Sequence, residues 1–185
     1  MAHSSKEPVA LPTSEETSRD DAIKRLLLNE ELADVSLQGI DGVTVHANRC
    51  ILAARSDVFH GMLFGNFAEA NKTVVQVGYT GEVLKALVEY IYTNESSILL
   101  ENASGQDQKS NMAGTIVTLA TAAMYFNLPV LCQKAREMVL KLIDDRKDHA
   151  GVIWKECRAI GPAAVETGID EIALEAIRLN PSTIL

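Results

Sequence analysis

The feature that most constrains the fold is a short β-hairpin pattern enclosed by helical patterns. Val35 and Leu37 alternate with polar residues, Val43 and Val45 alternate again, and the tetrapeptide 39–42 between them contains two glycines. Alternation with a period of two indicates half-buried strands, and the glycines favour a turn that joins them. Because so small a sheet cannot bury its apolar face alone, we expect helices to cover it.

Helical spacing of apolar residues predicts helices on both sides of this hairpin. Each predicted helix carries apolar residues three or four positions apart, which places them on one face. A capping residue, Ser18, Ser56 or Thr80, precedes three of these helices. In chain order we expect a helix ending at Asn29, the hairpin, short helices at Arg49–Ala54 and after Ser56, a strand at Thr73–Val77, a helix after Thr80, and two helices that end near Asn127 and Leu142, the second opening at Pro129.

The remaining segments have weaker or mixed patterns. Ser96–Leu100 predicts a brief strand, and the polar segment Glu101–Asn111, which has no regular period, predicts a mobile surface loop. The charged run Asp144–Asp148 predicts a linker. Beyond it, two amphipathic segments stop at Gly161-Pro162 and before Asn180-Pro181, which predicts a C-terminal helical pair. The whole order is typical of an α+β fold with helices around a small sheet.

Charge and cysteine content argue against several functional classes. The chain has 17 Lys and Arg against 25 Asp and Glu, a formal net charge of −8, which disfavours nucleic-acid binding through phosphate contacts. No stretch approaches the ~18 apolar residues of a membrane span, and residues 1–19 lack the apolar run of a signal peptide. Cys50, Cys132 and Cys157 lack zinc-ligand spacing, and such thiols are typical of the cytoplasm or nucleus. We therefore expect no metal, nucleic acid or membrane among the partners.

No arrangement of residues in the sequence indicates an enzyme or a cofactor site. Asp57 and His60 lie three positions apart, but no serine or cysteine nucleophile in a tight turn accompanies them. His46 and Cys50 supply only two of the ligands that a zinc site needs. Glycine motifs that bind phosphates or dinucleotides do not occur in the sequence.

Three stretches of the chain resemble the BTB/POZ domain family. They are Glu31–Leu37, Ile51–Phe59 and Leu87–Thr93, in the order and spacing of that family. The resemblance implies a helical cluster flanked by a short sheet. It divides the chain into a disordered N-terminal tail over 1–19, a BTB/POZ domain over 20–143 with a loop insertion at about 101–111, and a helical extension over 144–185 that resembles a short BACK domain.

The chain departs from the family pattern at three positions. Asn48 stands where the family usually has histidine, Asp57 where proline is common, and Asn94 where glycine often closes a turn. Asparagine tolerates the left-handed backbone conformation, so Asn94 is a mild change. The change at Asn48 affects hydrogen bonding near the expected dimer face.

The resemblance implies a function in protein association. BTB domains dimerise, and one branch of the family binds the cullin-3 N-terminal domain of ubiquitin ligases through a hydrophobic-x-Glu motif after its third helix. Phe67, Ala68 and Glu69 lie at that place. We expect Phe67 to fill an apolar groove on cullin-3 and Glu69 to accept hydrogen bonds from it. The alternative is that Phe67 folds back onto its own domain.

Apolar residues cover more of the first helix than one core-facing stripe requires. Ile23, Leu26, Leu27 and Leu28 spread around this helix, which indicates a twofold dimer face. We expect Ile23, Leu26 and Leu27, together with Arg49, at the interface of a homodimer. The alternative is deep burial of the helix in its own chain.

The expected function is that of a non-enzymatic adaptor that presents a substrate protein to a cullin-3 ubiquitin ligase. Kelch repeats, a MATH domain and zinc fingers are not recognisable in the sequence, so the substrate is not identified. Two alternatives remain open. One is a BTB scaffold of transcriptional or cytoskeletal complexes that does not bind cullin-3, and the other is a tetramerising BTB domain of the channel-associated kind.

Overall fold

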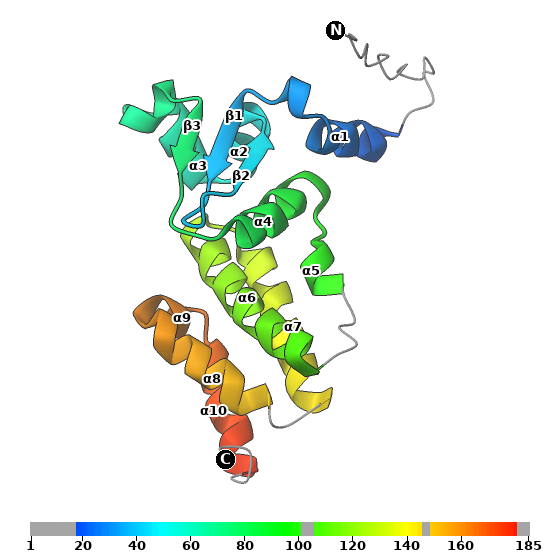
Figure 1. Ribbon diagram of the computed structural model, residues 1–185, viewed down its shortest axis with the longest axis vertical. Helices are drawn as coiled ribbons and strands as arrows, with labels where there is room; N and C mark the ends of the chain where they lie inside the picture. The colour runs from blue at the N-terminus through cyan, green and yellow to red at the C-terminus, as the bar shows by residue number, and fades with distance from the viewer. Residues whose placement is uncertain (1–17, 101–105, 146–148, 181–185) are drawn as a thin grey trace, which may run out of the picture.

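The computed structural model describes residues 18–100, 106–145 and 149–180. Its elements, in chain order, are α1 (Arg19–Leu28), η1 (Glu30–Leu32), β1 (Val35–Gln38), β2 (Thr44–Ala47), α2 (Arg49–Arg55), α3 (Asp57–Phe64), η2 (Ala68–Asn71), β3 (Val74–Gln76), α4 (Gly81–Thr93), α5 (Ser97–Leu100), α6 (Gln106–Tyr125), α7 (Pro129–Asp145), α8 (His149–Ile160), α9 (Pro162–Glu166) and α10 (Ile169–Leu179). Figure 1 shows the sheet with α1 to α3 at one end of the long axis, α6 and α7 in the middle, and α8 to α10 at the other end. The fold is therefore α+β, as the sequence predicts.

Three short strands form one sheet in the order β2-β1-β3. β1 pairs antiparallel with β2, where Leu37 lies opposite Val45, and parallel with β3, where Leu37 lies opposite Val75. These side chains are buried on one face of the sheet. On the strands' other face Ser36 and His46 are hydrogen-bonded, with 3.0 Å between Oγ and Nδ1. The predicted hairpin and its alternation are confirmed.

The turn of the hairpin also holds the start of α4. Both carboxylate oxygens of Asp41 accept a hydrogen bond from the Gly81 amide at 3.0 Å, and one of them accepts from the Val43 amide at 3.2 Å. A Cβ on Gly81 would lie 2.3 Å from the side chain of Val43, so the close approach requires glycine. Thr80 and Ser18 occupy N-cap positions without a side-chain cap bond, so the side-chain caps predicted there are wrong.

The segment after α4 differs from the sequence-based expectation. Ser97–Leu100 is the helix α5 and not a strand, and its residue Ile98 is buried. The helix α6 begins at Gln106, inside the segment expected to be a loop, while 101–105 lies outside the described residues. α6 packs against α4, α7 and α8. The absence of a regular period in this segment therefore did not exclude a helix.

Residues 149–180 of the C-terminal extension form three helices, so the predicted helical pair is incomplete. Gly161 turns the chain with φ of 84°, and Pro162 then opens α9. Proline suits the first helical position, because its fixed φ is already helical and its missing N–H is not needed there. α8 and α10 pack against α6 and α7, with Ile153, Cys157 and Ile177 buried. The extension is continuous with the rest of the core in the described residues.

Two of the predicted segment boundaries fall within helices of the structure. α1 begins at Arg19, and the tail before residue 18 lies outside the described residues, as does 181–185. α7 runs to Asp145, into the charged run expected to be a linker, and 146–148 is outside the described residues. Within the described ranges, no helix is both long enough and apolar enough to cross a membrane.

An aromatic stack joins α3 to the end of α6. The rings of Phe59 and Phe126 lie nearly parallel with their centroids 4.2 Å apart, and both side chains are fully buried. Ser56 stabilises the same contact between α3 and the end of α6. Its hydroxyl donates to the Phe126 carbonyl at 2.6 Å and accepts from the Phe59 amide at 3.2 Å. The predicted Ser56 cap is confirmed, and it also fixes α3 against α6.

A buried hydrogen-bond network surrounds Asn48, one of the departures from the family pattern. The Tyr92 hydroxyl donates to the Asn48 side-chain oxygen at 2.9 Å and accepts from the Asn48 amide at 2.7 Å. The Asn48 side-chain nitrogen donates to the Leu32 carbonyl at 2.5 Å. Burial raises the pKa of Tyr92, which keeps its hydroxyl protonated and able to donate. Asn48 thus ties α2 to both α4 and η1.

Tyr92→Phe tests this network. Removal of the hydroxyl leaves a buried amide and a buried carbonyl oxygen without their partner, which should cost about 1–3 kcal/mol in the free energy of unfolding. Thermal unfolding followed by circular dichroism should show a lower Tm. Tyr125→Phe is the control, because Tyr125 is 57% exposed and should leave the Tm unchanged. Equal Tm values for the two variants would contradict the network's role.

Candidate interaction site at the end of helix α3

The exposed face of α3 carries an aromatic surface. Phe59 and Leu63 point into the core, whereas His60 and Phe64, each one position further along the helix, are exposed. On that outer face the rings of His60 and Phe64 lie 6.0 Å apart, and Phe64 is 55% exposed. Exposed aromatic residues at one place are typical of protein interaction sites.

The loop after α3 places Phe67 beside this surface. α3 ends where the Gly65 amide donates to the Gly61 carbonyl at 2.9 Å, and Phe67 then precedes η2. A Cβ on Gly65 would lie 3.4 Å from the Phe67 ring, and one on Gly61 would lie 4.0 Å from it. The ring therefore lies along the glycines of α3, yet 63% of the residue is exposed. Phe67 therefore contacts the end of α3 with one side of its ring and exposes most of its surface to solvent.

The residues that follow Phe67 complete the predicted motif. Ala68 is exposed in η2, and Glu69 is partly exposed. The Glu69 carboxylate lies 3.5 Å from the Lys72 ammonium, with the two side chains 35% and 53% exposed. Such a solvent-exposed pair contributes little stability, so the carboxylate is able to exchange Lys72 for a partner's donors at small cost. The structure brings Phe67, Ala68 and Glu69 together at one exposed edge.

Arg49 lies under this loop, a role that the sequence analysis missed. Its guanidinium donates to the carbonyls of Leu63, Ala70 and Lys72, at 3.3 Å and 2.9 Å for the first two. Its Nε lies 3.4 Å from the Asp34 carbonyl. No local periodicity signals a contact between an arginine and carbonyls 14 to 23 residues further along the chain. The expectation that Arg49 lies in a dimer interface stays a prediction.

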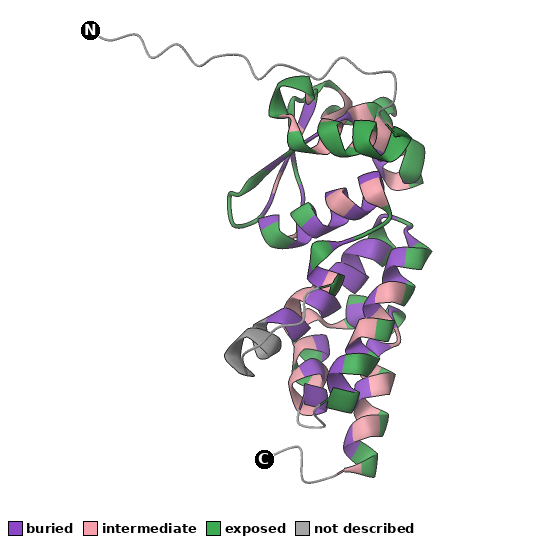
Figure 2. Ribbon diagram, turned by 90° about the vertical axis from the view of Figure 1, so that its right-hand side faces the viewer, coloured by how far each residue is buried: buried purple, intermediate pink, exposed green. Residues whose placement is uncertain are grey.

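The other residues predicted for the dimer interface lie on α1. Ile23, Leu26 and Leu27 are half-buried and pack against the core, and α1 contacts α4 and β2. None of the ten residues of α1 is buried, and Leu28 is 81% exposed. Figure 2 shows only exposed and intermediate colours along this helix. Deep burial of α1 within its own chain, the alternative for this helix, is therefore wrong.

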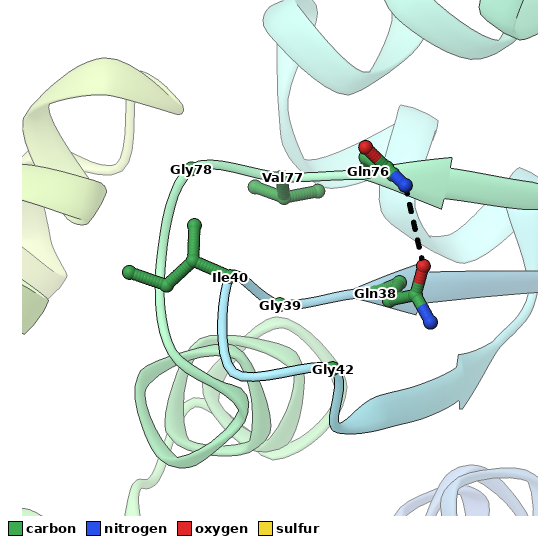
Figure 3. Close-up of a pocket in the computed structure, with 7 residues that line it drawn as sticks. All are labelled: Gln38, Gly39, Ile40, Gly42, Gln76, Val77 and Gly78. Carbon is green, nitrogen blue, oxygen red and sulfur yellow. Dashed lines mark hydrogen bonds between the residues drawn. The ribbon is translucent and has the colours of Figure 1, made fainter.

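A separate pocket lies at the turn end of the sheet (Figure 3). Its residues come from the ends of β1 and β3 and from the turns that follow them, and one hydrogen bond of 3.4 Å joins the two glutamines across it. No residue that lines it is ionisable. It therefore offers neither an acid–base pair nor a charged metal ligand. The lining residues are Gln38, Gly39, Ile40, Gly42, Gln76, Val77 and Gly78.

Two potential nucleophiles in the described residues, Ser36 and Cys157, lack surroundings that would activate them. Ser36 and Glu30 flank His46, but Glu30 is 79% exposed and its carboxylate is 4.0 Å from the imidazole, so solvent competes for that contact. Burial raises the pKa of the Cys157 thiol to about 11, which keeps it protonated. Among these residues no group of three or more His, Cys, Asp and Glu could hold a metal ion.

Comparison with known proteins identifies similar domains. A family model described as the BTB/POZ domain matches residues 23–142. The chain is 27% identical over 105 residues to the Inhibitor of Bruton tyrosine kinase of Mus musculus, a match that covers 56% of this chain and 7% of that protein. It is 34% identical over 90 residues to BTB/POZ domain-containing protein 9 of Drosophila melanogaster (49% and 12%) and 31% identical over 83 residues to human Kelch-like protein 23 (44% and 15%). The matches thus span 7% to 15% of the lengths of these relatives.

Gly65→Ala and Gly61→Ala form a matched pair that tests the loop geometry. A Cβ on Gly65 would lie 2.2 Å from the Gly61 carbonyl oxygen, so Gly65→Ala should lower the free energy of unfolding by about 1–3 kcal/mol. A Cβ on Gly61 meets only the edge of the Phe67 ring at 4.0 Å, so Gly61→Ala should be neutral or stabilising. Urea unfolding measures both values. Equal losses in the two variants would contradict the described end of α3.

Proposed function

Because this chain belongs to the BTB/POZ domain family, a family of protein-interaction modules, we propose that it is a substrate adaptor that binds the cullin-3 N-terminal domain in an E3 ubiquitin ligase. The observation that carries the proposal is the exposure of Phe67, at 63%, in the hydrophobic-x-Glu motif after α3. The adaptor performs no chemistry itself. It holds a substrate protein, not yet identified, close to the ligase.

Phe67 is the proposed anchor of this contact. Full burial of a phenylalanine side chain contributes about 1.5–3 kcal/mol, and most of the Phe67 surface is still available for burial by a partner. The neighbouring exposed ring of Phe64 enlarges the apolar area that cullin-3 would cover. Aromatic residues that fill pockets carry much of the energy in protein interfaces.

Glu69 is the proposed polar contact beside the anchor. Its carboxylate pairs with Lys72, and both side chains of this pair are partly exposed. A carboxylate at this place suits backbone amides at the N-terminus of a partner helix, where the helix dipole is positive. The apolar anchor then supplies affinity, and the carboxylate fixes the orientation of the partner.

The proposed site of action is the cytoplasm, the nucleus or both. Ubiquitin ligases of this type work in these reducing compartments. Cys50, Cys132 and Cys157 are free thiols in the structure, which is compatible with such a compartment.

We propose further that the protein is a homodimer through α1. Because Leu28 is 81% exposed, Leu28→Glu should leave the fold of one chain intact and place charges in the dimer interface. Light scattering should give twice the 20.1 kDa chain mass for the parent protein and the single mass for Leu28→Glu. Leu100→Glu, at a residue 67% exposed on α5, is the control and should remain dimeric. A monomeric parent protein, or four subunits, would contradict the dimer.

Calorimetric titration with the cullin-3 N-terminal domain tests the adaptor function. Phe67→Ala should weaken binding by roughly 30- to 1,000-fold, which corresponds to about 2–4 kcal/mol. Leu100→Ala is the control, because Leu100 is as exposed as Phe67 and lies on α5, away from the motif.

Two outcomes would contradict the proposal. Weakening of less than about threefold by Phe67→Ala would remove Phe67 as the anchor, because an interface hot spot costs more than that. Absence of binding by the folded parent protein would favour a BTB scaffold of transcriptional or cytoskeletal complexes in place of a cullin-3 adaptor.

A further inference from the structure

The loop that carries Phe67 has few contacts of its own. None of the residues of η2 is buried, and Phe64 and Phe67 on its N-terminal side are mostly exposed. A segment with few buried apolar contacts opens at low cost in free energy. A partner that requires Phe67 in one position would then bind only the fraction of molecules in which the loop is closed, that is, in which it holds Phe67 in the position described above.

Arg49 stabilises the loop through hydrogen bonds to its backbone carbonyl groups. One terminal nitrogen of its guanidinium donates both to the Leu63 carbonyl in the last turn of α3 and to the Ala70 carbonyl in η2. The other terminal nitrogen donates to the Lys72 carbonyl, just before β3. A single planar group therefore connects the two ends of the loop to each other.

The backbone of Arg49 is itself fixed. Its amide donates to the Asp34 carboxylate at 2.7 Å, and its Nε contacts the Asp34 carbonyl. Asp34 directly precedes β1, so the backbone of Arg49 is fixed to the sheet. From there the guanidinium extends to the carbonyl groups at both ends of the loop after α3. The Leu63 carbonyl lies at the C-terminal end of α3, where the helix dipole favours a positive charge.

We infer that Arg49 is a positioning residue that holds the loop 64–72 closed and so presents Phe67 to its partner. This inference rests on the proposed function only for the identity of that partner. Arginine carries its N–H donors on three nitrogens of a planar guanidinium, so they point in several directions. Lysine has all three of its N–H donors on one nitrogen. Lysine at position 49 keeps the positive charge and cannot reach carbonyls at three places.

Fluorine NMR distinguishes this role from a general structural one. The chain has four phenylalanines, and 4-fluorophenylalanine reports on each of them. Phe59 and Phe126 form the buried stack and report on the core, whereas Phe64 and Phe67 report on the loop. The experiment compares the full chain with Arg49→Lys and with the control Arg55→Lys. Arg55 lies on the same helix and donates to Asn94, outside the loop.

In Arg49→Lys, the Phe67 signal should move toward the value of the unfolded chain, while the signals of Phe59 and Phe126 stay in place. In Arg55→Lys all four signals should stay in place. If the loop is closed only about a tenth of the time in Arg49→Lys, affinity for the cullin-3 N-terminal domain falls about tenfold. Light scattering on the same samples should show no change in mass.

An unchanged Phe67 signal in Arg49→Lys would overturn the inference, as would equal shifts of all four signals. A halved mass with an unchanged Phe67 signal would also overturn it and assign Arg49 to the dimer interface. A shifted Phe67 signal in a protein that does not bind cullin-3 would uphold the positioning role and contradict only the proposed function. If Arg49→Lys does not fold, Arg49→Gln provides the same comparison.

Discussion

The stack of Phe59 on Phe126 is the contact on which the placement of the site depends. It joins α3 to the end of α6 with both rings fully buried, and Ser56 links the two backbones at the same point. With one face of α3 held against the core, the helix has no freedom to turn its aromatic outer face inward. The exposure of Phe64 and the direction of the loop after α3 follow from that single orientation.

The same region shows how a small domain keeps apolar surface available without losing its fold. The Phe67 ring lies on the glycines of α3, and the loop is held by arginine-to-carbonyl hydrogen bonds instead of by buried side chains. Polar contacts of this kind fix a backbone and leave the side chains beyond it free for a partner. At the other edge of the sheet, beside β2, α1 likewise packs on the core without burying any of its residues completely.

Local patterns in the sequence predicted the elements whose stability is local. The alternation around Leu37 and Val45, the Ser56 cap and the helix opening at Pro129 all appear in the structure, and Asn94 takes the left-handed conformation that asparagine tolerates. The misses depend on contacts distant in sequence, such as that of Asp41 with the start of α4 and the packing of α5 against α6 and α7. The motif at Phe67 was predicted by its place in the chain, whereas the support from Arg49 was not, because no sequence period encodes it.

Hydrogen exchange of the full chain with and without the cullin-3 N-terminal domain tests the central claim most directly, because it reports the bound surface without a substitution. The account predicts that amides of α3 and of the following loop, about residues 57–72, exchange more slowly in the complex. Protection confined to other elements, or unchanged exchange of the α3 loop in a saturated complex, would contradict it.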